Sequence, residues 1–156
     1  MMRITILWPG KTKNQDFRRL QEHYLEKINR MERCEIIETK EARGLSEKEG
    51  ERILELEASG IEKYIKDDYI ICLLDRGKRM SSEEFARFLE EKGAFAGQSL
   101  TFIVGGFLGL AERVLRRAHL MLSLSHMTFS HELTRVVLLE QIYRSLCMIK
   151  GKPYAK

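Results

Sequence analysis

The chain has 156 residues and a mass of 18.3 kDa, and 44% of its residues are hydrophobic while 32% are charged. This apolar content suits one packed domain over residues 1–156, and the composition excludes a disordered, collagen-like or low-complexity chain. The longest uninterrupted apolar stretch, 69–74, is far shorter than the roughly 20 residues that cross a bilayer. The sequence also begins without the apolar segment of a secretory signal, so we expect a cytoplasmic protein with no membrane partner.

The positive charge is concentrated in the second half of the chain. Lysine and arginine number 27 against 23 aspartate and glutamate, a net charge of +4; residues 1–75 carry −2 and residues 76–156 carry +6. A basic surface gains free energy on an acidic polymer by releasing counterions, which makes nucleic acid the first partner to consider. A solubilising surface without a partner is the alternative interpretation.

The first third of the chain predicts a strand, a helix and a second strand. A β-branched run at 3–8 predicts the opening strand, apolar residues at steps of three and four predict a helix over 16–33, and a short apolar run predicts a strand over 34–38. The motif Ser46-x-x-Glu49 is a capping box. It predicts the start of a charged helix that mostly faces solvent.

Three further strands are predicted at 68–74, 100–104 and 119–125. The first is apolar throughout, as is typical of a strand buried on both faces, and the charged turn at 75–78 is expected to end it. Helical patterns follow these strands, and the last helix is expected over 131–150. Strands alternating with helices predict an α/β fold with a mostly parallel sheet and helices on both faces.

The sequence IVGGFLG lies at the end of the strand predicted over 100–104, and its three glycines allow the backbone to approach another group closely. Its spacing matches neither the dinucleotide-binding fingerprint nor the P-loop, which argues against a phosphate cradle. The turn then either binds a phosphate-free ligand at the carboxyl ends of parallel strands or is a tight strand-to-helix turn without a ligand.

Two later segments have both a binding and a structural interpretation. Residues 122–129, LSLSHMTF, combine short polar side chains with apolar ones, which suits a loop around a nucleoside or an ordinary connection capped by Ser130. The basic C-terminal segment carries Tyr154, which suits phosphates and an unstacked base or a solvated chain end.

The histidines and cysteines do not predict a metal site. His126 and His131 are five residues apart, which is not the i, i+4 spacing of a helical zinc pair, and no third ligand lies near them in sequence. The three cysteines are far apart and never form a C-x-x-C pair, so we expect no disulfide framework and interpret them as small core residues.

Three motifs together resemble one known family. LLDRGKRMSSEEFA at 73–86, FIVGGFLGL at 102–110 and the segment from 122 to 154 resemble the large-subunit ribosomal RNA pseudouridine N3-methyltransferases of the SPOUT class, and the likeness extends over essentially the whole chain. It implies a trefoil-knotted α/β fold, a homodimer and S-adenosylmethionine as cofactor. It also implies methylation of N3 of a pseudouridine in 23S ribosomal RNA, with the assembled ribosome as substrate.

The resemblance also assigns roles to individual residues. The implied cofactor contacts are Leu73, Gly105, Leu124, Ser125, His126, Met127, Thr128 and Phe129. In the last helix, Arg135 is a candidate to stabilise a developing imide anion and His131 is a candidate proton acceptor. Tyr154 would position or stack on the target base.

This chain departs from the family pattern at two informative positions. Ala155 stands where the family tail usually has a histidine, and Phe107 is bulkier than the residue usual in the glycine turn. Two other functions therefore stay open. One is a ribosome- or RNA-binding protein of this fold with weak or lost catalysis, and the other is a methyltransferase acting on a different RNA nucleoside.

Overall fold

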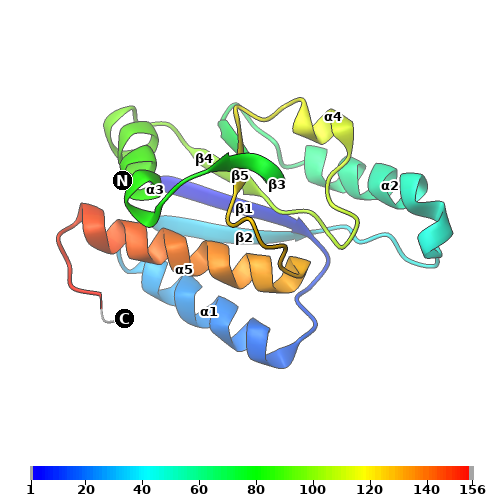
Figure 1. The fold of residues 1–156 in the computed structure, drawn as a ribbon, viewed down its shortest axis with the longest axis horizontal. Helices are drawn as coiled ribbons and strands as arrows, with labels where there is room; N and C mark the ends of the chain where they lie inside the picture. Colours follow the sequence, from blue (N-terminus) through cyan, green and yellow to red (C-terminus); the bar gives the residue numbers. More distant parts are fainter. Residues whose placement is uncertain (1, 155–156) are drawn as a thin grey trace.

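The computed structural model describes residues 2–154. Five strands form one parallel sheet in the order β2-β1-β4-β3-β5 (Figure 1). The strands are β1 (Arg3–Pro9), β2 (Arg33–Thr39), β3 (Tyr69–Arg79), β4 (Leu100–Ile103) and β5 (Leu120–Ser123). The helices are α1 (Gln15–Asn29), α2 (Gly50–Glu62), α3 (Ser82–Leu89), α4 (Glu112–Leu115) and α5 (His131–Ile149), with a 3-10 turn at Glu47–Glu49 and a π-helical segment at Glu90–Phe95.

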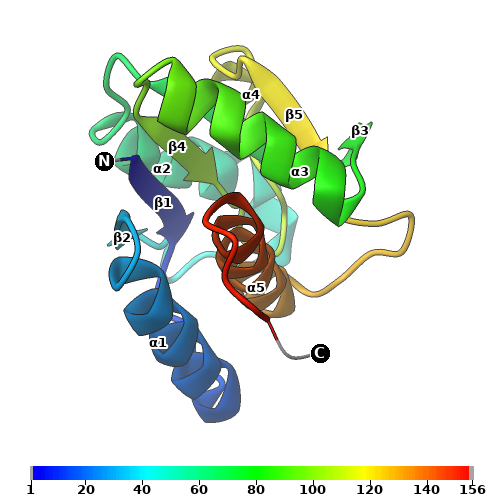
Figure 2. The same ribbon diagram turned by 90° about the vertical axis from the view of Figure 1, so that its left-hand side faces the viewer.

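Helices cover both faces of the sheet, which confirms the predicted α/β architecture. Helices α1, α3 and α5 pack on one face and α2 and α4 pack on the other (Figures 1 and 2). Each face of the sheet has its own hydrophobic core, and neighbouring residues of a strand point into different cores. Ile6 and Phe102 pack under α1, α3 and α5, whereas Leu7 and Ile103 pack under α2 and α4. All four side chains are fully buried, as expected for parallel strands covered on both faces.

The ends of the helices follow from their capping residues. The Asn14 side chain accepts hydrogen bonds from the first turn of α1, the capping box of Ser81 and Glu84 opens α3, and Ser130 caps α5. Gly151 follows the last helix with a φ of 64°, a left-handed conformation that glycine adopts readily. The predicted starts at residues 16 and 131 agree with α1 and α5 to within one residue, whereas α1 ends at Asn29, before the predicted end at residue 33.

Strand β3 does not end where the sequence predicted. The charged residues 75–78 were expected to form a turn, but β3 continues to Arg79 and pairs with Leu122 of β5 twice, through Leu73 and again through Lys78. The residues between these two pairings form a bulge. Gly77 allows it, because a Cβ there would lie 2.7 Å from the Met121 carbonyl carbon.

Helix α2 is more buried than its charged sequence suggested. Ala58 and Ile61 pack against the sheet in the second core, beside Leu7 of β1. The expectation of a mostly solvent-facing helix is therefore wrong for this face of α2. Within residues 2–154, no helix combines the length and apolar character needed to cross a membrane.

All three cysteines are free and buried, as predicted. Burial raises the pKa of both Cys34 and Cys72 to about 12, so these thiols stay protonated and pack as small apolar groups. The trefoil knot implied by the family resemblance stays a prediction.

Candidate functional site

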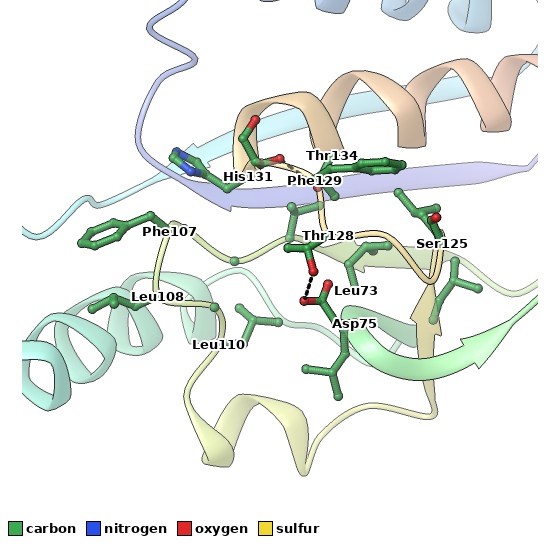
Figure 3. Close-up of a pocket in the computed structure, with 18 of the residues that line it drawn as sticks. Leu73, Asp75, Phe107, Leu108, Leu110, Ser125, Thr128, Phe129, His131 and Thr134 are labelled. Carbon is green, nitrogen blue, oxygen red and sulfur yellow. Dashed lines mark hydrogen bonds between the residues drawn. The ribbon is translucent and has the colours of Figure 1, made fainter.

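A cavity of about 560 Å³ opens at the carboxyl ends of β3, β4 and β5 (Figure 3). Its walls are the β3 bulge with Leu73, the turn 104–110 after β4 and the loop 124–131 that leads into α5. Ligands of α/β folds bind at this edge of a parallel sheet, and small-molecule sites commonly measure about 300–1,000 Å³. Position and volume therefore both favour a ligand of moderate size.

The structure brings most of the predicted cofactor contacts together around this cavity. Those that line it are Leu73, Gly105, Leu124, Ser125, Met127, Thr128 and Phe129. His126 is exposed and does not line the cavity. The three segments that contain these residues are separate in sequence, and they meet because β4 and β5 both flank β3.

The glycine turn is a tight closure of the chain on itself. The Gly109 amide donates to the Gly106 carbonyl at 3.0 Å, and a Cβ on Gly105 would lie 2.5 Å from the Gly109 carbonyl oxygen. Glycine is therefore needed at position 105 for the turn to form. Phe107, at the tip, does not fill the cavity, because its side chain is directed outward and is 57% exposed.

Local hydrogen bonds order the loop on the opposite wall. The Ser123 hydroxyl donates to the Ser125 carbonyl, and the Ser125 hydroxyl accepts from the Met127 amide, both at 2.9 Å. The Thr128 hydroxyl donates to the Asp75 carboxylate at 3.4 Å, a long contact that links this loop to the β3 bulge (Figure 3). Thr128 and Asp75 therefore meet in the lining of the cavity.

Asp75 is a site residue that the sequence analysis missed. Among the described residues lining the cavity, it is the only one that carries a carboxylate, and the bulge directs it there together with Arg76. The sequence pattern predicts a turn at Asp75, outside the strand. Its place directly after a buried parallel strand was the signal available, because that edge of the sheet collects functional side chains.

His131, the first residue of α5, lines one end of the cavity and is half-buried. Burial lowers the pKa of His131 below its ordinary 6.5, and the positive charge of Arg135 lowers it further. The imidazole is therefore neutral at pH 7 and has a free nitrogen that accepts a proton.

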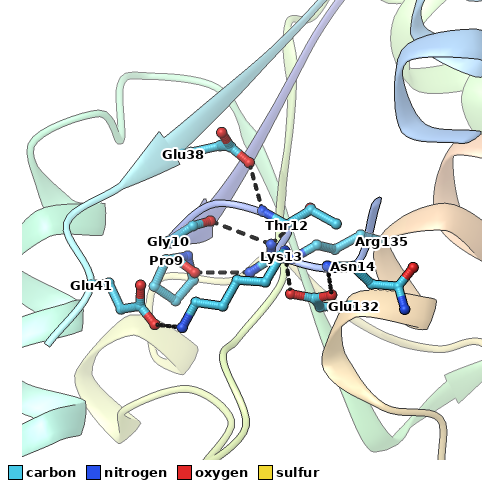
Figure 4. A network of polar contacts seen from close by, with 9 residues as sticks. All are labelled: Pro9, Gly10, Thr12, Lys13, Asn14, Glu38, Glu41, Glu132 and Arg135. Atoms are coloured by element: carbon cyan, nitrogen blue, oxygen red, sulfur yellow. Dashed lines mark hydrogen bonds and ion pairs between the residues drawn. The ribbon is translucent and has the colours of Figure 1, made fainter. Parts of the chain in front are cut away.

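Arg135 is buried beneath the site and does not line the cavity. Its side chain is 1% exposed, and its guanidinium donates to the carbonyls of Pro9 at 2.8 Å and Gly10 at 3.3 Å and to the Thr12 hydroxyl at 3.0 Å (Figure 4). It also lies over the Trp8 ring, 4.7 Å from the ring centroid. Arg135 thus joins α5 to the loop between β1 and α1.

Carboxylates complete this junction. Glu132 accepts hydrogen bonds from the amides of Lys13 at 2.7 Å and Asn14 at 3.0 Å, and Glu38 accepts from the Thr12 amide at 3.2 Å (Figure 4). Burial lowers the pKa of Arg135 to about 10, so the guanidinium stays charged at neutral pH. We refer to Arg135, Glu132 and residues 9–14 as the α5 clamp.

Tyr154 lies far from the cavity. Its ring packs against Tyr143, with the centroids 5.1 Å apart, and Arg144 lies 4.4 Å from its centroid. Tyr143 comes twelve positions after His131 in α5, which corresponds to about 18 Å of helix. Burial raises the pKa of Tyr154 to about 12, so the phenol keeps its proton. Ala155 lies outside the described residues.

No group of three or more histidine, cysteine, aspartate or glutamate side chains within residues 2–154 is arranged to hold a metal ion. The titratable groups that line the cavity in this part of the chain are Asp75, Arg76 and His131. The site therefore offers one anion, one cation and one neutral imidazole.

Comparison with known proteins identifies the family. A family model described as "Predicted SPOUT methyltransferase" matches residues 2–155. Proteins named ribosomal RNA large subunit methyltransferase H from Clostridium beijerinckii and Alkaliphilus oremlandii are 42% and 43% identical to this chain, and each alignment covers 99% of this chain and 100% of the relative. The chain therefore belongs to the SPOUT methyltransferases, in the ribosomal RNA large subunit methyltransferase H family, as its motifs indicated.

Solved structures share the fold at low sequence identity. TrmJ from Z. mobilis matches with a TM-score of 0.55 and 10% identity, over 100% of this chain and 73% of that chain. A putative methylase family protein from Neisseria gonorrhoeae matches with a TM-score of 0.54 and 11% identity, over 99% of this chain and 86% of that chain. The parallel sheet is thus of the kind found in known methylase structures.

Replacing Arg135 with methionine is expected to lower the free energy of unfolding by about 2–4 kcal/mol. Methionine keeps apolar contact with Trp8 but leaves the Pro9 and Gly10 carbonyls buried without a donor. Urea unfolding measures the loss. Arg19→Met is the matched control, because the Arg19 side chain is 75% exposed and should change stability by less than about 0.5 kcal/mol. Equal effects of the two substitutions would contradict the α5 clamp.

Proposed function

We propose that this chain transfers a methyl group from S-adenosylmethionine to N3 of a pseudouridine in large-subunit ribosomal RNA, with the assembled ribosome as substrate. The observation that carries the proposal is the cavity at the carboxyl ends of three parallel strands. Relatives at 42% and 40% identity are named ribosomal RNA large subunit methyltransferase H, which supports ribosomal RNA as the substrate.

The cavity suits a cationic nucleoside without phosphates. Leu73, Leu110 and Leu124 provide apolar walls for adenosine, and the backbone of the glycine turn provides hydrogen-bonding groups. Asp75 complements positive charge. When bound, the donor supplies an electrophilic methyl group on a sulfonium; its transfer to N3 forms the N–C bond and breaks the C–S bond, leaving a neutral thioether.

The chain must also align the base and remove the N3 proton of the imide before or during the transfer. His131 takes this proton, because its imidazole lines the cavity and is neutral at pH 7. Arg135 has no surface on the cavity and acts as a positioning residue, holding the first turn of α5 in place. Alignment and proton removal require neither a metal nor a covalent intermediate.

Tyr154 reaches a target base only through a second copy of the chain. Its ring is held at the far end of α5 by Tyr143 and Arg144, so within one chain it lies far from the cavity. A homodimer in which each tail serves the partner's cavity accounts for both the position of Tyr154 and its proposed contact with the base.

Methyl transfer to ribosomes that lack the modification tests the proposal. Labelled S-adenosylmethionine should transfer its methyl group to large subunits, and mass spectrometry of the nucleosides should find N3-methylpseudouridine. Subunits with uridine at the target position should not be labelled, and protein-free ribosomal RNA should be labelled more slowly than assembled particles.

The outcomes separate the candidate functions. Labelling of another nucleoside would contradict the pseudouridine assignment and favour a different RNA methyltransferase. No labelling with intact donor binding, measured by calorimetry, would contradict turnover and favour a ribosome-binding role, which Ala155 in place of the usual tail histidine suggests.

Asp75→Asn is expected to weaken binding of S-adenosylmethionine about fivefold and to leave S-adenosylhomocysteine binding nearly unchanged. The two ligands differ in the sulfonium charge, and the attraction of an exposed carboxylate for a nearby cation is worth up to about 1 kcal/mol. Calorimetry measures both dissociation constants. Arg76→Gln removes a positive charge from the same bulge and should not weaken binding of S-adenosylmethionine. Equal losses for both ligands in Asp75→Asn would show that Asp75 does not interact with the sulfonium.

His131→Gln is expected to lower kcat by about 100-fold or more, the usual contribution of a general base. In the unmodified protein, kcat should fall as the pH drops through the lowered pKa of His131, below 6.5, because protonation abolishes the acceptor. The positive charges of Arg135 and Lys13 lower the pKa of His131, whereas the negative charges of Glu132 and Glu41 raise it.

A pH–rate profile checks the assignment of His131. The acidic decline should disappear in His131→Gln and persist in His23→Gln, in which an exposed histidine on α1 is replaced. An unchanged acidic decline in His131→Gln would assign proton removal to another group.

A further inference from the structure

The glycine turn holds one aromatic side chain at the opening of the cavity. Gly106 and Gly109 pair across the turn, so Phe107 and Leu108 occupy its tip. A Cβ on Gly105 would clash with the Gly109 backbone at 2.5 Å, and Gly109 has a φ of 83°. These constraints close the turn tightly on itself and fix where the Phe107 side chain leaves the backbone.

Phe107 contributes little to the folded core. Its side chain is 57% exposed and belongs to neither hydrophobic cluster, although it lines the cavity. Figure 3 places Phe107 and His131 at the same end of the cavity, with both rings directed outward and away from the contact between Asp75 and Thr128. An exposed aromatic ring in this position is available to a ligand that enters from outside.

The geometry of methyl transfer restricts how an RNA base can enter this end of the cavity. The nitrogen that accepts the methyl group must come within about 3–3.5 Å of it, so the target base has to reach the mouth of the cavity out of its own stack. A base outside its stack loses its neighbouring rings, and aromatic side chains replace them in single-stranded RNA recognition. Arg76, which also lines the cavity, and the net +6 of residues 76–156 favour the phosphates beside such a base.

We propose that Phe107 is the stacking surface for the target base, held beside His131 by the closed glycine turn. This inference rests on the proposed function and adds to it a residue that recognises the RNA. Stacking presents the face of the base to Phe107 and leaves the N3 edge free to meet the methyl group and the imidazole.

The test compares substitutions of Phe107 by RNA affinity, measured with S-adenosylhomocysteine present so that no turnover occurs. Phe107→Ala should weaken binding of ribosomal particles by about 5- to 150-fold, the range found for loss of one stacked base. Phe107→Trp should bind within about twofold of the unmodified protein. Phe107→Leu keeps apolar area without an aromatic face and should resemble alanine more than tryptophan.

Phe95→Ala is the matched control. Phe95 is 76% exposed at the end of the π-helical segment and does not line the cavity, so its loss should leave RNA affinity unchanged. Donor affinity by calorimetry and molecular mass by light scattering should be unaltered in all Phe107 variants. A changed mass would instead place Phe107 in an interface between copies of the chain and overturn the proposal.

The results separate this inference from the proposed function. If Phe107→Ala binds RNA as tightly as Phe95→Ala, stacking by Phe107 is wrong even where methyl transfer proceeds. If the unmodified protein binds RNA through Phe107 but transfers no methyl group, the proposed reaction is wrong and the RNA contact holds. If the unmodified protein does not bind ribosomal particles, both proposals are wrong.

Discussion

The site depends on one buried guanidinium. Arg135 donates to the backbone carbonyls of Pro9 and Gly10 at the end of β1 and lies over the Trp8 ring, so it fixes the start of α5 against β1. A loop alone would not hold α5 there, because the chain between β5 and α5 has no strand or helix of its own. The position of His131 in the cavity wall therefore depends on the buried charge of Arg135, which does not itself line the cavity.

The cavity itself follows from the topology of the sheet. Strand β3 lies between β4 and β5, so the segments after these two strands emerge on either side of it and face each other. The bulge in β3 then turns Asp75 toward the space between them. Parallel strands gather the chain segments that follow them at one edge, and here that edge combines apolar walls, one carboxylate and one imidazole.

The sequence predicted the alternation of strands and helices, and most of the cofactor contacts implied by the resemblance line the cavity, but the groups that organise the cavity were not predicted. Hydrophobic periodicity and capping residues are local signals, so the strands and the starts of α1, α3 and α5 were predictable. Asp75 was missed because the bulge depends on β3 pairing twice with Leu122, a contact between distant residues. The family resemblance made Arg135 a catalytic candidate, and an arginine in a helical pattern gives no sign that it binds carbonyls 125 and 126 residues away.

The position of Arg135 also affects chemistry that it does not touch. Arginine keeps its charge even when burial lowers the pKa to about 10, so the clamp places a permanent cation under the first turn of α5. That cation disfavours a second positive charge on His131, and partial burial acts in the same direction. The same residue that fixes where the imidazole lies therefore helps to keep it neutral, which links the stability of this corner of the fold to its ability to accept a proton. A neutral side chain in place of Arg135 would weaken both properties together, whereas a change at Asp75 would act on the bound ligand and on the contact with Thr128.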